Sequence, residues 1–326
     1  MPNLIETLAG NLLVPTILFF ALGLLAAFVR SDLSIPEGAA KFMSLYLLLA
    51  IGFKGGSNLA EQGATTHLFL TILTGVLLSF AIPFAAFGLL RIMTRLDPLN
   101  AAAVAGHYGS ISIVTFVTAT SLLDLVGLSH DGFMVAVAAA MEVPAIISAL
   151  WLASRRSGAA DAGSAQSGGM LWRDLLANGS IVLLTGAFAI GAVTGGKGMD
   201  MIAPFIVTPF TGILCLFLLD MGLNAGRSLL RNRHMLSCGL FGFGMLMPMV
   251  GAAMAFVAGS ILGLMPGSLF LLMVLSASAS YIAVPAAMKI ALPRAESGIY
   301  LTLSLGVSFP FNITVGLPLY LWLATL

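Results

Sequence analysis

The chain has 326 residues, of which 59% are hydrophobic and 8% are charged, and its mean hydropathy is +1.06. Soluble domains carry about 25% charged residues, so this composition disfavours soluble enzymes, nucleic-acid-binding proteins and disordered proteins. The net charge of +1 gives no strong field that would attract polyanions, and the chain is therefore predicted to be a polytopic membrane protein.

Ten segments are long and apolar enough to cross a bilayer, which takes about 20 residues in a helix. We therefore expect an all-α polytopic membrane protein with transmembrane helices near residues 9–29, 36–53, 67–90, 99–123, 132–152, 176–195, 203–222, 236–263, 267–291 and 298–324. Residues 154–172 form the one long connection. They are rich in Ala, Gly and Ser, which predicts a flexible loop.

The basic residues predict the orientation of the spans, because Lys and Arg gather on the cytoplasmic side. With the N-terminus outside, only Lys54 and Lys197 lie outside. The remaining basic residues lie on or near the inner side: Arg30, Lys41, Arg91, Arg95, Arg155, Arg156, Arg173, Arg227, Arg231, Arg233, Lys289 and Arg294. We expect a protein integral to the plasma (inner) membrane, with both termini extracytoplasmic and the 154–172 loop in the cytoplasm.

The two halves of the chain match at a constant shift of 170 residues. The pattern Leu49-x-x-Gly52-x-x-x-Gly56-x-x-Leu59 aligns with Leu219-x-x-Gly222-x-x-x-Gly226-x-x-Leu229, and Ser110, Val114 and Leu122 align with Ser280, Val284 and Leu292. Each half has five spans, so the second copy is inverted. We predict one five-helix repeat at residues 1–153 and an inverted one at 173–326, a signature of secondary transporters. The Gly-x-x-x-Gly pairs are predicted to pack helices.

Spans four and nine contain matched helix breaks. Residues 105–115 read Ala-Gly-His-Tyr-Gly-Ser-Ile-Ser-Ile-Val-Thr, and residues 276–285 read Ser-Ala-Ser-Ala-Ser-Tyr-Ile-Ala-Val-Pro. Gly and Pro weaken a helix. The half-helix N-termini would suit an anion, and exposed carbonyls with hydroxyls would suit Na⁺. The alternative is that small residues here only allow close helix packing.

A few ionisable or amide groups fall inside the spans. Glu142 lies mid-span beside Pro144, where a carboxylate is costly, so it is either a cation ligand, proton site or gate, or a neutral buried acid. Asn312, its partner at a shift of 170, is either a ligand or a helix–helix hydrogen-bonding group. His107 is either a structural group or a proton-coupling or anion-contacting one. We expect Asp220 at the interface.

Motifs for enzymatic or ATP-driven function are absent from the sequence. There is no His-Glu-x-x-His or clustered Cys/His zinc motif, no Gly-x-Ser-x-Gly elbow and no phosphate-binding loop. The protein is thus predicted not to be an enzyme, and its transport to be secondary or passive. One alternative is an intramembrane enzyme that uses Glu142 and His107.

In order and spacing, several segments together resemble the cyanobacterial-type sodium-dependent bicarbonate transporter family, over nearly the whole chain. They are Ile35-Pro-Glu-Gly-Ala-Ala-Lys41, Ile51-Gly-Phe-Lys-Gly-Gly56, Tyr108-Gly-Ser-Ile-Ser-Ile-Val-Thr115, Met141-Glu-Val-Pro144, Asp220-Met-Gly222, Ser276–Pro285, Leu292-Pro293 and Phe309-Pro310. The resemblance implies ten spans, an elevator mechanism, homotrimers, Na⁺ coupling and an anion site between the two breaks.

The candidate residues follow from the breaks and the resemblance together. The substrate-binding candidates are Tyr108, Gly109, Ser110, Ile111, Ser112, Ser278, Ala279, Ser280 and Tyr281. The ion-coupling candidates are Thr115, Glu142, Ser276, Asn312 and His107. Tyr281 stands where the family has an Asp, and Ile113 and Val114 replace small residues, which weakens the case for the same Na⁺ site and for the same anion.

The sequence as a whole predicts a secondary active transporter of a small anion, with Na⁺-coupled bicarbonate uptake as the first hypothesis. The alternatives are a passive anion channel and a symporter of another small anion coupled to H⁺. The expected partners are the anion, the lipid bilayer and, by resemblance, two further copies in a homotrimer. We expect no nucleic acid and no cofactor besides Na⁺. The family's PII-like regulator is not expected, because the loop is short and featureless.

Overall fold

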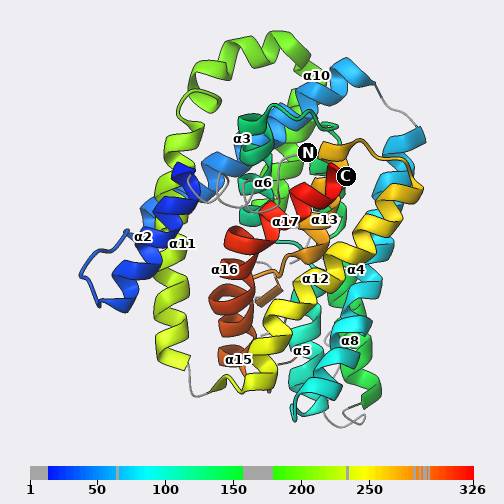
Figure 1. The fold of residues 1–326 in the computed structure, drawn as a ribbon. Helices are drawn as coiled ribbons and strands as arrows, with labels where there is room; N and C mark the ends of the chain where they lie inside the picture. The colour runs from blue at the N-terminus through cyan, green and yellow to red at the C-terminus, as the bar shows by residue number, and fades with distance from the viewer. Residues whose placement is uncertain are drawn as a thin grey trace.

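The computed structural model describes residues 14–63, 66–156, 179–232, 235–281, 284–285, 288, 292 and 294–326. Their regular structure is helical (Figure 1). The elements are α2 (Pro15–Phe28), α3 (Glu37–Gln62), α4 (Thr66–Met93), α5 (Pro98–Gly109), α6 (Ile113–Val126), α7 (Met134–Ala140), α8 (Pro144–Arg156), α10 (Gly179–Ile206), α11 (Phe210–Asn232), α12 (Cys238–Ile261), α13 (Pro266–Ala277), α15 (Ser297–Leu301), η2 (Thr302–Ser308), α16 (Phe309–Phe311), η3 (Asn312–Gly316) and α17 (Leu317–Ala324). The predicted 154–172 loop lies almost wholly outside the described residues.

Seven stretches in the described part of the chain are long and apolar enough to cross a membrane. Two of them, Pro98–Val126 and Met134–Ala153, are broken helices. Of the other predicted spans, α2 and α13 are apolar but shorter, and α3 contains four charged residues. The expectation of a helical membrane protein is therefore confirmed, whereas ten crossing helices and an inverted repeat stay predictions.

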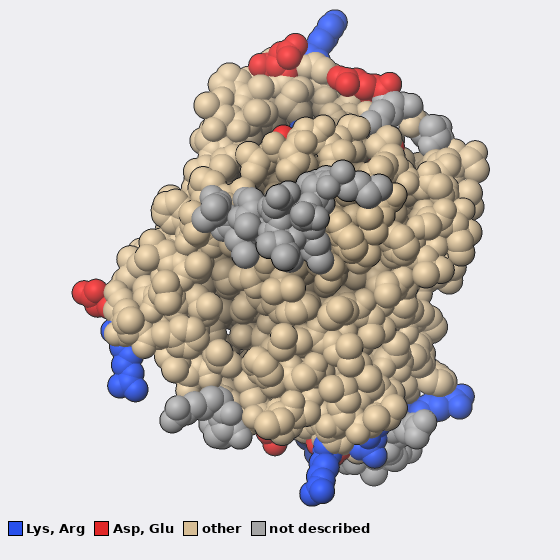
Figure 2. Space-filling model, in the orientation of Figure 1, with Lys and Arg blue, Asp and Glu red and all other residues tan. Residues whose placement is uncertain are grey.

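Charged side chains lie toward the two ends of the molecule. In Figure 2 a broad uncharged area lies between these ends, interrupted at the left edge by an acidic group and a basic group, and the Lys and Arg visible on this face lie mostly in the lower half. Many large apolar side chains are exposed, for example Leu25, Leu73, Val193 and Val257. Such a surface is what contact with lipid hydrocarbon requires.

Four helices form one unit, which we call the four-helix body: α2, α3, α10 and α11. Here α3 packs along α10 and α2 packs along α11. A Cβ added at Gly52 or Gly56 would collide with the α10 backbone, at Leu184 and Phe188 respectively. In the same way Gly222 meets the backbone of Phe20 on α2. The prediction that the Gly-x-x-x-Gly pairs pack helices is confirmed.

The remaining helices, α4 to α8 and α12 to α17, form the broken-helix body. Here α4, α5 and α8 pack together, α12 packs on α4 and α13, and α13 packs on α6 and α17. Asp97 caps α5, because its carboxylate accepts the amides of Leu99 and Asn100. Ser112 caps α6 and Ser237 caps α12. The last span contains two wide π-helical turns, η2 and η3.

Candidate functional site

The two predicted breaks are present in the structure. The first lies between α5 and α6, where Ser110 and Ser112 have extended backbones. The second follows α13, where Ser278 is extended in the same way. Gly109 is the last residue of α5, and Pro83 and Ala145 pack so closely on it that a Cβ there would collide with both. Both helices therefore stop in the interior of the broken-helix body.

The breaks contact each other directly. The amide of Ser112 donates to the hydroxyl of Ser278 (2.8 Å), and the amide of Ser280 donates to the carbonyl of His107 (2.7 Å). The residues that follow the two helix ends, Ser110 and Ser278, are 168 positions apart (278 − 110). The structure thus pairs the breaks two residues away from the predicted shift of 170.

Three carbonyls near the ends of the first half-helices have hydrogen-bond partners within the protein. The hydroxyl of Ser278 donates to Leu275 O (2.8 Å), the side-chain amide of Asn312 donates to Ala277 O (2.9 Å), and His107 O accepts Ser280 N. These carbonyls already have partners. The structure therefore gives little support to the idea that they serve as cation ligands.

The amide end of α6 and two residues of the second break, Ser280 and Tyr281, lie at a cavity. Ser112 accepts the amide of Thr115 (3.3 Å), and Ser280 accepts the amide of Val284 (3.4 Å). Ile113 and Val114, in the first turn of α6, line the cavity. The N-terminus of a helix carries partial positive charge and unpaired amides. This end of the breaks is therefore the one suited to an anion.

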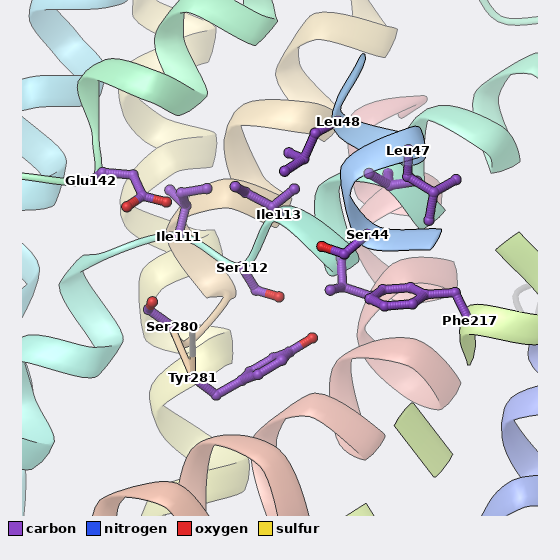
Figure 3. Close-up of a pocket in the computed structure, with 12 residues that line it drawn as sticks. Ser44, Leu47, Leu48, Ile111, Ser112, Ile113, Glu142, Phe217, Ser280 and Tyr281 are labelled. Atoms are coloured by element: carbon purple, nitrogen blue, oxygen red, sulfur yellow. The ribbon is translucent and has the colours of Figure 1, made fainter. Parts of the chain in front are cut away.

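The cavity lies between the two bodies, and Figure 3 shows the side chains that surround it. Ile111, Ser112, Ser280 and Tyr281 come from the breaks, as predicted. Ser44, Leu47, Leu48 and Phe217 come from α3 and α11 and were not among the candidates. Ser44 could have been noticed as a hydroxyl inside an apolar span, but three apolar residues carry no sequence signal.

The space at this site is small. The cavity holds about 20 Å³, close to the minimum for one water molecule. The Tyr281 ring extends toward the side of Ser44 and Phe217 (Figure 3), and it stacks edge-on against Phe309 at 5.4 Å. The Tyr281 hydroxyl lies near Ser112 without completing a hydrogen bond. An anion larger than water therefore requires side chains here to move.

Glu142 lines the same cavity. It lies in the short turn between α7 and α8, its side chain is 4% exposed, and Figure 3 shows its carboxylate on the side of Ile111. Its carboxylate forms no hydrogen bond or ion pair with a described residue. A buried carboxylate without a partner is strongly unfavourable. The group therefore needs a proton or a cation.

Three predicted residues hold the breaks in place away from the cavity. The Tyr108 hydroxyl bonds to Ser308 (2.6 Å). The His107 ring bonds through Nδ1 to Ala103 O (2.7 Å) and stacks on Tyr300 at 4.4 Å. Both polar atoms of the Asn312 side chain are used, since its Oδ1 also accepts the Tyr320 hydroxyl (3.0 Å). For His107 and Asn312 these contacts favour the structural alternative.

The remaining candidates surround the breaks without lining the cavity. The Thr115 hydroxyl donates to Ser112 (3.0 Å), and Ala279 is buried. The hydroxyls of Ser110 and Ser276 are buried and have no hydrogen-bond partner. The Nε2 atom of His107 is also buried and also lacks a partner. These three atoms are unpaired polar groups in the described interior, and each has an unmet hydrogen-bonding capacity.

Asp220 is buried within the protein, and its expected place at the membrane interface stays a prediction. Its side chain is only 6% exposed, and Asn224 donates to it within α11 (3.1 Å). One helical turn separates it from Phe217, which lines the cavity. Among the described residues, no group of three His, Cys, Asp or Glu side chains is placed to bind a metal.

Two comparisons with known proteins bear on this site. A family model described as the Na⁺-dependent bicarbonate transporter superfamily matches residues 15–325. A comparison with curated proteins finds no match. The family match covers both breaks, Glu142 and the residues of the four-helix body that line the cavity.

Proposed function

Because the chain belongs to the Na⁺-dependent bicarbonate transporter superfamily, we propose that it is a secondary active transporter that takes up a small anion, with bicarbonate as the substrate and Na⁺ as the coupling ion. The observation that carries this proposal is the difference between the two sides of the breaks. Three carbonyls at the ends of α5 and α13 are bonded within the protein, whereas the amide end of α6 and the hydroxyl-bearing residues Ser112 and Ser280 line the cavity.

The substrate would bind at the start of α6 and at the segment after Ser280. Among the described residues, no Lys or Arg lines this cavity, so backbone amides and the hydroxyls of Ser112 and Ser280 would hold the charge. Ser112 and Ser280 each already accept an amide, and their hydroxyl protons can be directed toward the anion. This mode of binding suits a small, oxygen-rich anion such as bicarbonate.

Coupling to a cation follows from Glu142. A carboxylate beside a bound anion repels it, and each charge is further penalised by the low dielectric. A cation that binds with the anion removes both penalties, so the two are expected to bind together. The cavity offers Na⁺ the Glu142 carboxylate with the hydroxyls of Ser112, Ser280 and Tyr281. A proton on Glu142 is the competing coupling ion.

Movement between the two bodies would give alternating access. The cavity is lined from both bodies, with Ser44 and Phe217 on one side and the breaks on the other. Displacing the broken-helix body along the four-helix body would carry the breaks from one side of the membrane to the other, as in an elevator. Homotrimer formation belongs to the same proposal, and the mass of the purified complex tests it.

Uptake of radiolabelled bicarbonate into proteoliposomes tests the function. An inward Na⁺ gradient should drive accumulation above equilibrium. Glu142→Gln should abolish the dependence on Na⁺, and Ser112→Ala with Ser280→Ala should raise KM about tenfold or more, as loss of charge-assisted hydrogen bonds implies. The matched controls are Glu61→Gln and Ser260→Ala, because both side chains are exposed and distant from the cavity.

Each alternative has its own outcome in this assay. Flux that only equilibrates, whatever the gradient, identifies a channel. Accumulation driven by a proton gradient and not by Na⁺ identifies H⁺ symport, with Glu142 as its proton site. If other small anions but not bicarbonate are accumulated, the site is right and the substrate is wrong. Wild-type uptake by the Glu142, Ser112 and Ser280 variants would contradict the site.

A further inference from the structure

A second and larger cavity lies on the same boundary between the two bodies. It holds about 320 Å³ and is lined by α2, α3, α6, α7 and α11, by Ile206 at the end of α10 and Leu317 at the start of α17, and by nearby connections. It continues the path of the first cavity. Leu48 of α3 and Val117 of α6 line the first cavity, and Ile51 and Thr118 of the same helices line the second. We call it the outer cavity, since the predicted orientation places it on the extracytoplasmic side.

An ion pair crosses the boundary at the outer cavity. Lys54 Nζ, on α3 of the four-helix body, lies 2.6 Å from Asp124 Oδ2, on α6 of the broken-helix body. Both residues line the outer cavity. The neighbouring carboxylate of Asp131 already accepts the hydroxyl of Ser268 (2.7 Å), and the carboxylate that Lys54 contacts is that of Asp124.

The two backbones also approach each other next to the ion pair. A Cβ added at Gly55 would lie 3.0 Å from the carbonyl of Gly132, and one at Gly132 would lie 2.6 Å from the carbonyl of Gly55. Gly55 follows Lys54, and Gly132 lies in the connection that leads into α7. Contact between the bodies at this end therefore includes a close backbone approach, packing of α7 on α3 and α10, and this ion pair.

We propose that Lys54 and Asp124 form a latch that holds the two bodies in the present arrangement, with the outer cavity open, and that this ion pair breaks during each transport cycle. The proposal rests on the proposed function, since it assumes that the bodies move past each other. Lys54 and Asp124 are positioning residues here, because they act on the relative placement of the bodies and do not touch the anion site.

The strength of the latch follows from its exposure. The Lys54 and Asp124 side chains are 41% and 52% exposed. Exposed ion pairs are weak, so loss of this one should shift the balance between arrangements about two- to fivefold. Salt screens such pairs, so the shift should shrink as ionic strength rises to about 1 M. A latch of this size holds one arrangement without stopping the exchange between arrangements.

The rate of cysteine labelling in the outer cavity tests the latch on the purified, substrate-free protein. Ser121 lines the cavity, so Ser121→Cys is introduced after Cys215 and Cys238 are replaced by alanine. A methanethiosulfonate reagent then reports how often the cavity is open. Lys54→Met and Asp124→Asn should each slow labelling two- to fivefold in low salt. The exchanged pair, Lys54→Asp with Asp124→Lys, should restore the rate to within twofold.

Lys197→Met is the matched control, because it removes another exposed basic residue predicted for the same side, within the four-helix body alone. It should leave labelling unchanged. Thermal unfolding confirms that each variant is folded. Unchanged or faster labelling in both single variants, or an exchanged pair that is folded but not restored, overturns the latch. The labelling assay uses no substrate, so its result does not depend on anion transport. If the latch variants label more slowly but the wild type accumulates no anion in proteoliposomes, the proposed function alone is refuted. If the wild type accumulates the anion but the latch variants label at the wild-type rate, the latch alone is refuted.

Discussion

Close backbone contacts at glycine join the helices of the four-helix body, whereas side-chain hydrogen bonds hold the breaks of the other body. Gly52 and Gly56 allow α3 to approach the backbone of α10, and Gly222 allows α11 to approach the backbone of α2. At the breaks, by contrast, Asn312, Ser278 and Ser112 take the place of missing helical hydrogen bonds. The four-helix body is therefore expected to be sensitive to added side-chain volume, and the broken-helix body to the loss of a hydrogen bond.

This difference suits the roles that we propose. A helix pair held by backbone contact has no polar group to satisfy and forms a continuous wall in lipid. A broken helix must bury several polar groups, and each must find a partner. The side chains of Ser278 and Asn312 bond to carbonyls at the end of α13, whereas the amide end of α6 lies at the cavity. The proposed site is thus located at the broken helices, where buried polar groups need partners.

The largest expected effect concerns the four-helix body. Gly56→Ala places a methyl group against the α10 backbone at Phe188, which must move because backbone cannot rotate away. We expect a loss near 3 kcal/mol, at the upper end of the range for overpacking, measured as a lowered Tm in detergent. The control is Gly186→Ala in α10, where a Cβ meets no atom within 4 Å. Equal stability of both variants would show that the helices are not held by this contact.

The second effect tests the broken-helix body. Asn312→Leu keeps the side-chain size but leaves Ala277 O without its donor, and a buried unsatisfied carbonyl costs about 1–3 kcal/mol. Tyr320→Phe removes only the hydrogen bond to Asn312 Oδ1 and should cost less. Thermal unfolding of both variants measures the order. A larger loss of stability for Tyr320→Phe would mean that the hydrogen bond from Asn312 to Ala277 O, at the end of α13, is not the main contribution of Asn312.

The helical regions were predictable because their signals are local. Apolar length located seven stretches of the described chain that can span a membrane, the Gly-x-x-x-Gly spacing identified close packing, and Gly, Ser and Pro inside apolar segments identified the breaks. The boundaries of α2 and α13 were less predictable, because helix ends depend on caps and neighbours. The shift of 168 at the break ends was missed, since sparse identities cannot fix a register when the backbone leaves the helix.

The site was predictable in part. Glu142, Ser112, Ser280 and Tyr281 line the cavity, as their polarity within spans indicated. His107 and Asn312 have the same polarity but bond inward, and only tertiary contacts separate the two cases. Leucines and a phenylalanine from the four-helix body were missed, because an apolar residue that faces a cavity has the same sequence appearance as one that faces lipid.

The third effect separates stability from binding. Ser112→Ala removes the cap of α6, and Ser237→Ala removes the equivalent cap of α12, which lies away from the cavity. Each should cost about 1 kcal/mol of stability. Only Ser112→Ala should also raise KM for the anion in proteoliposomes, because Ser112 lines the cavity. A raised KM in both variants would mean that loosening the broken-helix body is enough to weaken binding, and that Ser112 has no direct role.

The smallest effect concerns Asp97, the cap that begins α5 at the far end of the same broken helix. Burial alone would raise the pKa of Asp97, but hydrogen bonds from Asn100 and Leu99 outweigh it and lower the pKa. A carboxyl with a lowered pKa in the folded protein stabilises above its unfolded pKa of about 4, and this contribution is lost as the pH falls through the folded value. Asp97→Asn keeps a capping side chain but cannot titrate there. The Tm of the wild type should therefore exceed that of Asp97→Asn by a small margin at neutral pH, and the margin should vanish in acid. A margin independent of pH would show that the charge of Asp97 does not contribute, and that the cap of this broken helix acts through hydrogen-bond geometry alone.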